Sequence, residues 1–357
     1  MKKLYICFHP YILYKTLVER MGDEENSYSL LLTDAISDLK PIVPALRKSG
    51  MFEQVEFFSC EPYRHYYDLF LHKNLPKSPV IRKLAMTKNY LVLMLSQRKF
   101  KKIALPFDLG SKKYDKIICA DFDYVINARL SMNHIEYAVF EHAKNVYQYF
   151  ESQKLWHIYT HLRRFLDKTH LLKGVGDTSR YCKEIIVNDT AAALSWLGRN
   201  RKVTIWDVDE HIAALTAQQK DQIFQLYVEG YSTNIDADQT YDLLLTSPLH
   251  IDAYLPSEGK QIQFYKDVIR DHFTHPVLIK PHPRDTVDYR RFFPECAVID
   301  QNISSEILIL SQNLKLGTVL TAFSSSGESF RERAEELVVL EDYRTPAAQM
   351  ESLKAYR

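Results

Sequence analysis

The sequence lacks the features of disulfide-rich, membrane-spanning, nucleic-acid-binding and repeat proteins. Its five cysteines are scattered and odd in number, without the spacing of a metal site, so a reducing compartment is expected rather than a disulfide scaffold. No apolar run approaches the ~18 residues of a membrane span. The formal net charge is only +1, which gives no support for a nucleic-acid-binding surface. Repeats and low-complexity tracts are also lacking.

The start of the sequence does not have the pattern of a signal peptide. Met1-Lys2-Lys3 is followed by an apolar run that His9 interrupts early. We therefore expect a cytoplasmic protein. Contact with the inner face of a membrane, through basic side chains such as Arg163 and Arg164, stays open beside the simpler reading that they face water.

What the chain does have is a regular alternation of strand-like and helix-like segments. At 357 residues with 46% hydrophobic content it can form about two domains. Such alternation predicts parallel sheets covered by helices, that is, an α/β protein. Expected strands are residues 4–8, 28–33, 55–59, 116–120, 135–140, 184–187, 203–206, 243–246, 277–280, 297–299 and 318–323. Expected helices are residues 11–21, 41–48, parts of 63–98, 143–166, 261–271, 304–310 and 327–336.

A polar stretch around residues 230–238 interrupts this alternation and marks a domain boundary. We expect domains 1–230 and 231–357, each built like a Rossmann fold, facing each other across a cleft.

The most informative segment is Val277–Asp285, an apolar run that ends in a His-Pro step between basic residues. A short run bounded by prolines favours a buried strand over a helix. Pro281 and Pro283 each fix a φ angle, so His282 should lie on a stiff loop. Ligands of open α/β sheets bind beyond the carboxyl ends of the strands, which is where His282 would lie. His9, after the first strand, could line another part of a cleft.

Ser324, Ser325 and Ser326 follow one expected strand and precede an expected helix. Serines at a helix start cap free N–H groups, which form an anion site together with the helix dipole. A simple cap is the equally good alternative. Because this turn and His282 both follow strands of one sheet, they can bind one phosphate. Lys280 and Arg284 would favour the same anion, or else neutralise surface carboxylates such as Asp285.

Two acidic positions in the first half could also carry chemistry. Glu141 follows an expected strand and could act as a general base in a cleft, although such a residue is more often a solvated first-turn carboxylate. Asp121 and Asp123 could bind a metal ion, but they also suit a helix cap, which we favour. We therefore expect no metal.

In their order, three motifs resemble those of bacterial sialyltransferases: Glu141-His142-Ala143, then Lys280-Pro281-His282-Pro283, then Ser324-Ser325. The chain is similar to glycosyltransferase family 52, whose members include lipooligosaccharide and capsule sialyltransferases. Residues 8–11 and the segment 243–249, which contains Thr246, share this similarity. The likeness extends over most of the chain.

The resemblance implies a GT-B fold and an inverting, metal-independent transfer from CMP-sialic acid to a terminal sugar, galactose being expected, of a bacterial surface glycan. It makes Glu141 the general base and His282 the group that donates a proton or hydrogen bond to the departing phosphate. By position, donor-binding residues are Lys280, Pro283, Thr246, Ser324, Ser325 and Ser326. His9 and His142 would line the acceptor side or the cleft. No cofactor is implied, and a homodimer is left open.

The chain departs from the family pattern at one place, where His142 and Ala143 replace a second acid and a glycine. Three alternatives follow. The donor could be another activated sugar, such as a UDP-sugar or a CDP-linked compound, or the enzyme could be weakened. A catalytically silent protein that binds nucleotides or carbohydrates is the third.

Overall fold

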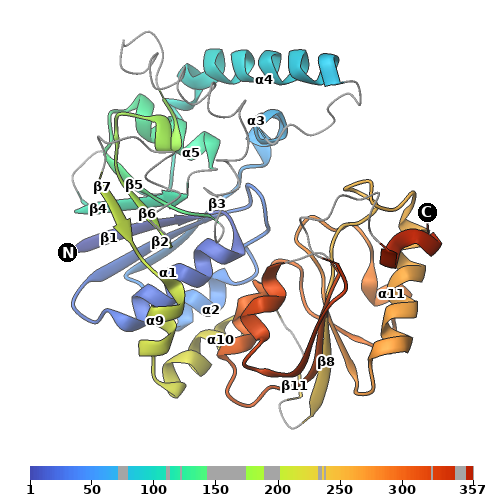
Figure 1. Ribbon diagram of the computed structural model, residues 1–357. Coiled ribbons are helices and arrows are strands. Elements are labelled where there is room, and N and C mark those ends of the chain that lie inside the picture. The colour runs from blue at the N-terminus through green and yellow to red at the C-terminus, as the bar shows by residue number, and fades with distance from the viewer. Residues whose placement is uncertain are drawn as a thin grey trace. The chain divides into compact units, whose positions relative to one another are not determined.

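The computed structural model divides into two compact units, Met1–Leu215 and Thr216–Arg357. It describes residues 1–70, 79–109, 113–120, 123–142, 174–188, 202–231, 235–236, 239–322, 325–341 and 351–356. Each unit contains a parallel sheet with helices packed on it (Figure 1). The predicted α/β class, with a Rossmann-like parallel sheet in each of two parts, is confirmed.

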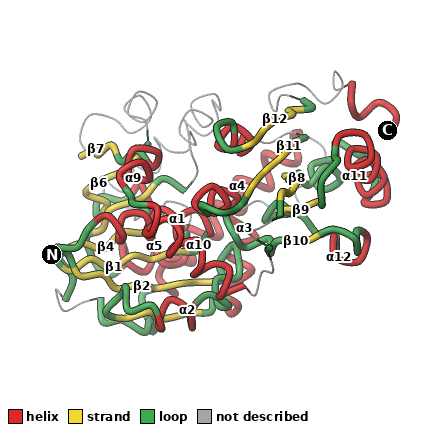
Figure 2. Tube along the Cα trace, turned by 90° about the horizontal axis from the view of Figure 1, so that it is seen from below, coloured by secondary structure: helices red, strands yellow, loops and turns green. Residues whose placement is uncertain are grey.

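The first unit is organised around a seven-stranded sheet in the order β3-β2-β1-β4-β5-β6-β7, with all neighbours parallel. Its strands are β1 (Lys2–Cys7), β2 (Ser27–Thr33), β3 (Gln54–Phe58), β4 (Lys116–Ala120), β5 (Tyr137–Phe140), β6 (Cys182–Val187) and β7 (Lys202–Ile205). Figure 2 shows strands of this sheet in yellow, with β1, β2, β4, β6 and β7 labelled. The central strands are nearly continuous apolar runs because helices cover both faces of a parallel sheet. From β1 the chain builds outward in one direction and from β4 in the other, so these strands flank the topological switch point, the expected ligand crevice.

Helices connect these strands. They are α1 (Pro10–Gly22), α2 (Val43–Lys48), α3 (Arg64–Phe70), α4 (Pro79–Phe100), α5 (Tyr124–Met132) and α9 (Val208–Ala214), with 3₁₀ turns η1 (Glu61–Tyr63) and η2 (Gly176–Thr178). Helix α1 begins where His9 caps it and Pro10 supplies a helical φ angle. Helix α5, which the sequence did not predict, begins at the cap Asp123, whose side chain accepts from the N–H of Ile126.

The second unit has a five-stranded parallel sheet in the order β10-β9-β8-β11-β12. Its strands are β8 (Thr240–Leu245), β9 (Val277–Lys280), β10 (Ala297–Val298), β11 (Lys315–Thr321) and β12 (Ala334–Val339). Its helices are α10 (Ala217–Tyr231), α11 (Glu258–His272), α12 (Tyr289–Phe292) and the 3₁₀ segments η3 (Ser305–Leu310), η4 (Ser325–Phe330) and η6 (Glu351–Tyr356). Here the switch point lies between β8 and β11.

The compact units divide at Leu215/Thr216, whereas the polar stretch in the sequence had suggested residues 230/231. Helix α10 accounts for the difference, because it packs against η3 of the second unit. A helix at residues 327–336 was also expected, and this expectation is wrong. Residues Ser325–Phe330 form a 3₁₀ turn, and Ala334–Val339 form the edge strand β12. The expected helix 143–166 lies outside the described residues.

A buried aspartate ties together the amino ends of three strands in the second unit. Asp242 of β8 accepts hydrogen bonds from the backbone N–H groups of Thr274, His275 and Thr318, each over 2.7 Å. Its other contact is the Nδ1 atom of His275, at 3.0 Å. Burial alone would raise the pKa of Asp242, but the hydrogen bonds from His275 and Thr318 hold it below its usual value. This arrangement stabilises the end of the sheet away from the candidate site.

Candidate functional site

In the second unit, β9 places His282 at the carboxyl edge of the sheet. The strand Val277–Lys280 was predicted with the same bounds, and it lies between β8 and β10. Thr246 follows the neighbouring strand β8, and the chain after β11 leads to Ser325. The carboxyl ends of three adjacent parallel strands therefore bring the Thr246, His282 and Ser325 backbone positions to one edge, around the switch point.

The loop that carries His282 is held from below by a network of polar side chains. The backbone N–H of His282 donates to the Oγ1 atom of Thr246 over 3.0 Å, and its carbonyl accepts from the N–H of Asp285 over 2.9 Å. The Asp285 carboxylate in turn accepts from Gln261 Nε2 at 2.9 Å and from the Tyr289 hydroxyl at 2.7 Å. Asp285 is only 5% exposed, so its description as a surface carboxylate was wrong. It is a buried anchor of the loop.

The imidazole of His282 has a defined hydrogen-bonding state. Its Nδ1 atom accepts a hydrogen bond from the backbone N–H of Arg284 over 3.1 Å. Burial lowers the pKa of His282 to about 4, and the positive charges of Arg284 and Lys280 act in the same direction. At neutral pH the ring is therefore uncharged, with its proton on Nε2. Such a ring offers one N–H donor to a ligand.

The two basic neighbours of His282 have other partners. The Lys280 ammonium is buried and donates to the carbonyls of Pro281, at 2.5 Å, and Gln301, at 3.3 Å. Burial lowers the pKa of Lys280 to about 8, while Glu306 and Asp300 act in the opposite direction. A direct contact of Lys280 with the donor stays a prediction.

Arg284 is bound to Asp252 through two hydrogen bonds of 2.9 Å each. Its guanidinium therefore neutralises a carboxylate, as one of the two sequence interpretations expected. The carboxylate, however, is Asp252 and not Asp285.

The serine turn, where we expected an anion site, does not lead into the expected α-helix. Ser324 lies outside the described residues, and Ser325 and Ser326 begin the six-residue 3₁₀ segment η4 instead of an α-helix. So short a segment does not supply the helix dipole on which the prediction depended. Phosphate binding by these serines stays a prediction from sequence order.

In the first unit, Glu141 follows β5 and is 2% exposed. Its Oε2 atom accepts from the backbone N–H of Asn188, at 2.9 Å, and from the Asn188 side-chain amide, at 3.1 Å. The interpretation of Glu141 as a solvated first-turn residue is therefore wrong. The carboxylate is fixed between β5 and β6, and two N–H donors stabilise its negative charge.

A lysine that the sequence analysis missed lies beside Glu141. Lys15 of α1 is completely buried, and its ammonium donates to the Glu141 carbonyl over 3.3 Å. It also lies 3.9 Å from the ring centre of Phe140, 5.4 Å from that of Tyr11 and 5.5 Å from that of Trp206. A buried ammonium is stabilised by such ring faces. Its position within a helix with many apolar neighbours was the available signal.

The other candidates of the first unit have local roles. His9 accepts from the N–H of Tyr11 through Nδ1, at 3.2 Å, and so caps α1. His142 is half-buried next to Glu141. Asp123 is fully buried and accepts from the Tyr67 hydroxyl at 2.6 Å, while Asp121 lies outside the described residues. Within the described ranges no three His, Cys, Asp or Glu side chains are arranged to bind a metal ion.

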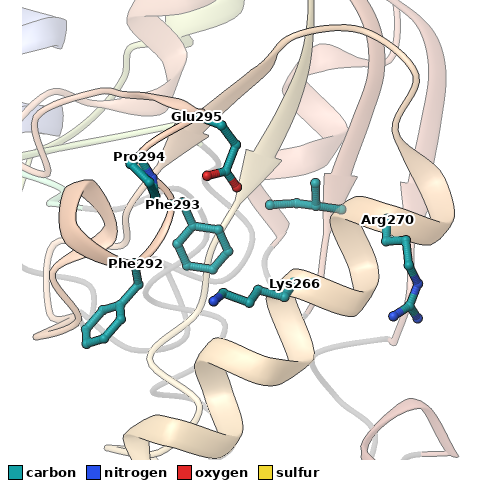
Figure 3. Close-up of a pocket in the computed structure, with 7 residues that line it drawn as sticks. Lys266, Arg270, Phe292, Phe293, Pro294 and Glu295 are labelled. Atoms are coloured by element: carbon teal, nitrogen blue, oxygen red, sulfur yellow. The ribbon is translucent and has the colours of Figure 1, made fainter.

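A surface pocket of about 520 Å³ lies in the second unit between α11 and the segment after α12. Figure 3 shows Lys266 beside the ring of Phe293, and Arg270 turned away from that ring. Arg270 pairs with Asp267 and Asp271. None of the candidate residues lines this pocket. The pocket therefore shares no lining residue with the His282 loop.

Comparison with known proteins connects the second half of the chain with a family. The model of glycosyltransferase family 52 matches residues 162–332, slightly less than half of the chain. This range contains Thr246, Lys280, His282 and the serine turn, but not Glu141. An uncharacterized protein of Haemophilus influenzae is 38% identical over 88 residues, which are 25% of this chain and 28% of that protein. The chain therefore matches little more than a quarter of the length of this curated relative.

Solved structures show a more distant likeness. A galactoside α-2,3-sialyltransferase from Photobacterium phosphoreum is 12% identical, with a TM-score of 0.48 over 99% of this chain and 94% of the other. A UDP-GlcNAc 2-epimerase from Neisseria meningitidis is 11% identical, with a TM-score of 0.45 over 99% and 86%. Likeness at this level transfers no activity. The family match therefore relates residues 162–332 of this chain to glycosyltransferase family 52.

Proposed function

We propose that this protein transfers sialic acid from CMP-sialic acid to a terminal galactose of a bacterial surface glycan, with inversion and without a metal ion. The observation that carries the proposal is the neutral His282 ring, with a proton on Nε2, at the carboxyl edge of a family-matched sheet. An uncharged N–H donor suits a phosphate that gains negative charge as it leaves.

On the donor side, the step breaks the bond between the anomeric carbon of sialic acid and the CMP phosphate oxygen. The electron pair stays with the phosphate. The Nε2–H group of His282 donates a hydrogen bond to that oxygen, and the turn at Ser324 and Ser325 holds the other phosphate oxygens. Pro283 shapes the loop, and Thr246 fixes it through the N–H of His282. These groups take the part that a metal ion plays in other transferases.

On the acceptor side, Glu141 removes the proton of the attacking hydroxyl, whose oxygen then forms the new bond to the anomeric carbon. A single displacement of this kind requires one base and one leaving-group stabiliser. Lys15 fixes the main chain of Glu141, and His9 and His142 follow the strands β1 and β5. The partners are a nucleotide-sugar donor and a lipooligosaccharide or capsular acceptor at the cytoplasmic face of the membrane.

A second candidate is a nucleotide-binding protein without turnover. The near-complete burial of Glu141 and its two hydrogen bonds with Asn188 favour it, because a general base must reach the acceptor hydroxyl. In this case the second unit would bind CMP while no sugar transfer follows.

Calorimetric binding of CMP, UDP, GDP and CDP without added metal tests the donor side. We expect selective binding of CMP that weakens in His282→Ala, whereas a preference for UDP or CDP, or no binding, would overturn the donor assignment. Transfer from CMP-sialic acid to a galactose-terminated acceptor tests the rest. CMP binding without transfer would favour the second candidate.

A further inference from the structure

Helix α4 carries a row of exposed apolar side chains on one face. Ile81, Leu84, Leu91 and Leu95 are 54%, 66%, 52% and 77% exposed. Their spacings of three, seven and four residues place them along one stripe of the helix. Scattered exposed apolar side chains are ordinary on a surface, but four in one row mark an interaction site.

The opposite face of the same helix is the one that packs on the protein. Leu93, Ser96, Gln97 and Phe100 are buried. The neighbours of α4 are α3 and α5, and Figure 1 shows the helix along the outer edge of the first unit. The apolar row is therefore not needed for the fold of this unit. The apolar row forms a separate face of α4, directed away from the buried face.

Every charged residue in the sequence segment that contains this row is basic. Between Asp68 and Asp108 the sequence contains nine Lys or Arg and no Asp or Glu, although the whole chain is nearly balanced at 46 basic and 45 acidic residues. Lys88 and Lys99 are exposed and, by helical position, lie on the same stripe as the leucines. Neither forms an ion pair within the described part of the chain. Cations without local partners beside leucines suit a surface that is both apolar and anionic.

We propose that this face of α4, defined by Ile81, Leu84, Lys88, Leu91, Leu95 and Lys99, docks onto the surface of an anionic lipid membrane. The leucines enter the boundary between headgroups and acyl chains, and the lysines contact lipid phosphates. Like charges oppose the pairing of α4 with the same helix of a second copy, so a lipid surface is the better occupant.

The docking is peripheral. No helix in the described ranges is long and apolar enough to cross a bilayer, and α4 lies along the surface of the unit. The inference does not depend on the sugar donor, but it deepens the proposed function, because it would bring the catalytic units to a lipid-linked acceptor.

Flotation of the full chain with vesicles tests the proposal. Vesicles of phosphatidylethanolamine with phosphatidylglycerol should bind at least about tenfold more tightly than vesicles of phosphatidylcholine, and added salt should weaken the binding. Leu84→Gln/Leu95→Gln and Lys88→Gln/Lys99→Gln should each weaken it by about tenfold or more. The matched control Ile251→Gln/Lys315→Gln removes one exposed apolar side chain and one exposed charge from the second unit, and should bind like the wild type.

Equal affinity for both kinds of vesicle, or α4 variants that bind like the control, would overturn the proposal. Loss of a dimer in light scattering, with lipid binding unchanged, would assign the face to a second copy instead. If Leu84→Gln/Leu95→Gln does not fold, the lysine pair decides, since it changes only exposed charges. CMP calorimetry on the same variants keeps the two proposals separate: the α4 variants should bind CMP unchanged, whatever their affinity for lipid.

Discussion

The backbone N–H of Arg284 donates a hydrogen bond to the Nδ1 atom of His282 over 3.1 Å, which leaves Nε2 as the protonated nitrogen of a neutral ring. The contact spans only two residues and is made possible by the turn that Pro281 and Pro283 enforce. The resemblance to family 52 implies that His282 gives a proton or a hydrogen bond to the leaving group. A neutral ring with its proton on Nε2 fits the hydrogen bond in our proposal.

The first prediction concerns the removal of this donor. His282→Ala should lower kcat by about 10²–10³, the usual effect of losing one donor to a developing oxyanion. Thr246→Val should have a smaller effect, because the Thr246 hydroxyl holds the loop through the N–H of His282 and through Asp285. Steady-state transfer assays measure both, and His272→Ala, at an exposed histidine of α11, is the control. Full activity of His282→Ala would contradict its role.

The second prediction is a pH profile. Because the pKa of His282 is lowered to about 4, the ring is already neutral at pH 6 and stays neutral up to pH 8. The kcat/KM value of the wild type should therefore stay free of any loss between pH 6 and pH 8 that is absent in His282→Ala. If the charged imidazolium were the acid, activity would fall about tenfold per pH unit above pH 4. Such a fall, absent in the variant, would restore proton transfer as the role of His282.

The strands could be predicted from sequence because continuous apolar runs are what a buried parallel sheet requires. The prediction of a helix at residues 327–336 was wrong for a physical reason. The Glu, Arg and Ala residues of this segment favour a helix, but pairing with β11 stabilises Ala334–Val339 as a strand. The helix propensity of the segment takes no account of the pairing with β11. Lys15 was missed in the same way, since its cage includes Phe140 and Trp206, which lie far away in the sequence.

The third prediction tests Lys15. Lys15→Met keeps the volume and removes the charge, so the free energy of unfolding should change by no more than about 2 kcal/mol. Lys15→Ala should cost about 2–4 kcal/mol, because it leaves a cavity. If Lys15 positions Glu141 through its carbonyl, Lys15→Met should lower kcat while CMP binding stays unchanged. Denaturant unfolding, transfer assays and calorimetry distinguish these effects. An unchanged kcat would make Lys15 purely structural.

The fourth prediction concerns the amino ends of β8 and β11. A Cβ atom at Gly317 would lie 2.6 Å from Asp242 Oδ1 and 2.7 Å from His275 Nδ1. Gly317→Ala should therefore destabilise the second unit by about 2–4 kcal/mol, since it crowds a buried hydrogen-bonded carboxylate. Gly259→Ala is the matched control, because its Cβ would meet only Ser257 Oγ at 3.9 Å. This control should be neutral or gain up to about 1 kcal/mol. Equal stability of the two variants in thermal unfolding would refute the packing argument.

The last prediction follows from Asp123 at the switch point of the first sheet. Burial raises the pKa of Asp123 to about 6, although hydrogen bonds from Tyr67 and Ile126 act in the opposite direction. Its Oδ2 atom is buried without a hydrogen-bond partner among the described residues. A raised carboxyl pKa means that the folded state holds a proton which the unfolded state has already released between pH 4 and 6.

Stability should therefore fall as the pH rises through this window, by up to about 3 kcal/mol. Asp123→Asn removes the titrating group while its side-chain oxygen can still accept from Tyr67 and Ile126. Denaturant unfolding at pH 4.5 and pH 7 should show a smaller loss of stability with rising pH in Asp123→Asn than in the wild type. The control is Asp177→Asn, at an aspartate of the turn η2, and its pH dependence should follow that of the wild type. Parallel curves for Asp123→Asn and the wild type would show that the carboxyl group is ionised in the folded protein throughout.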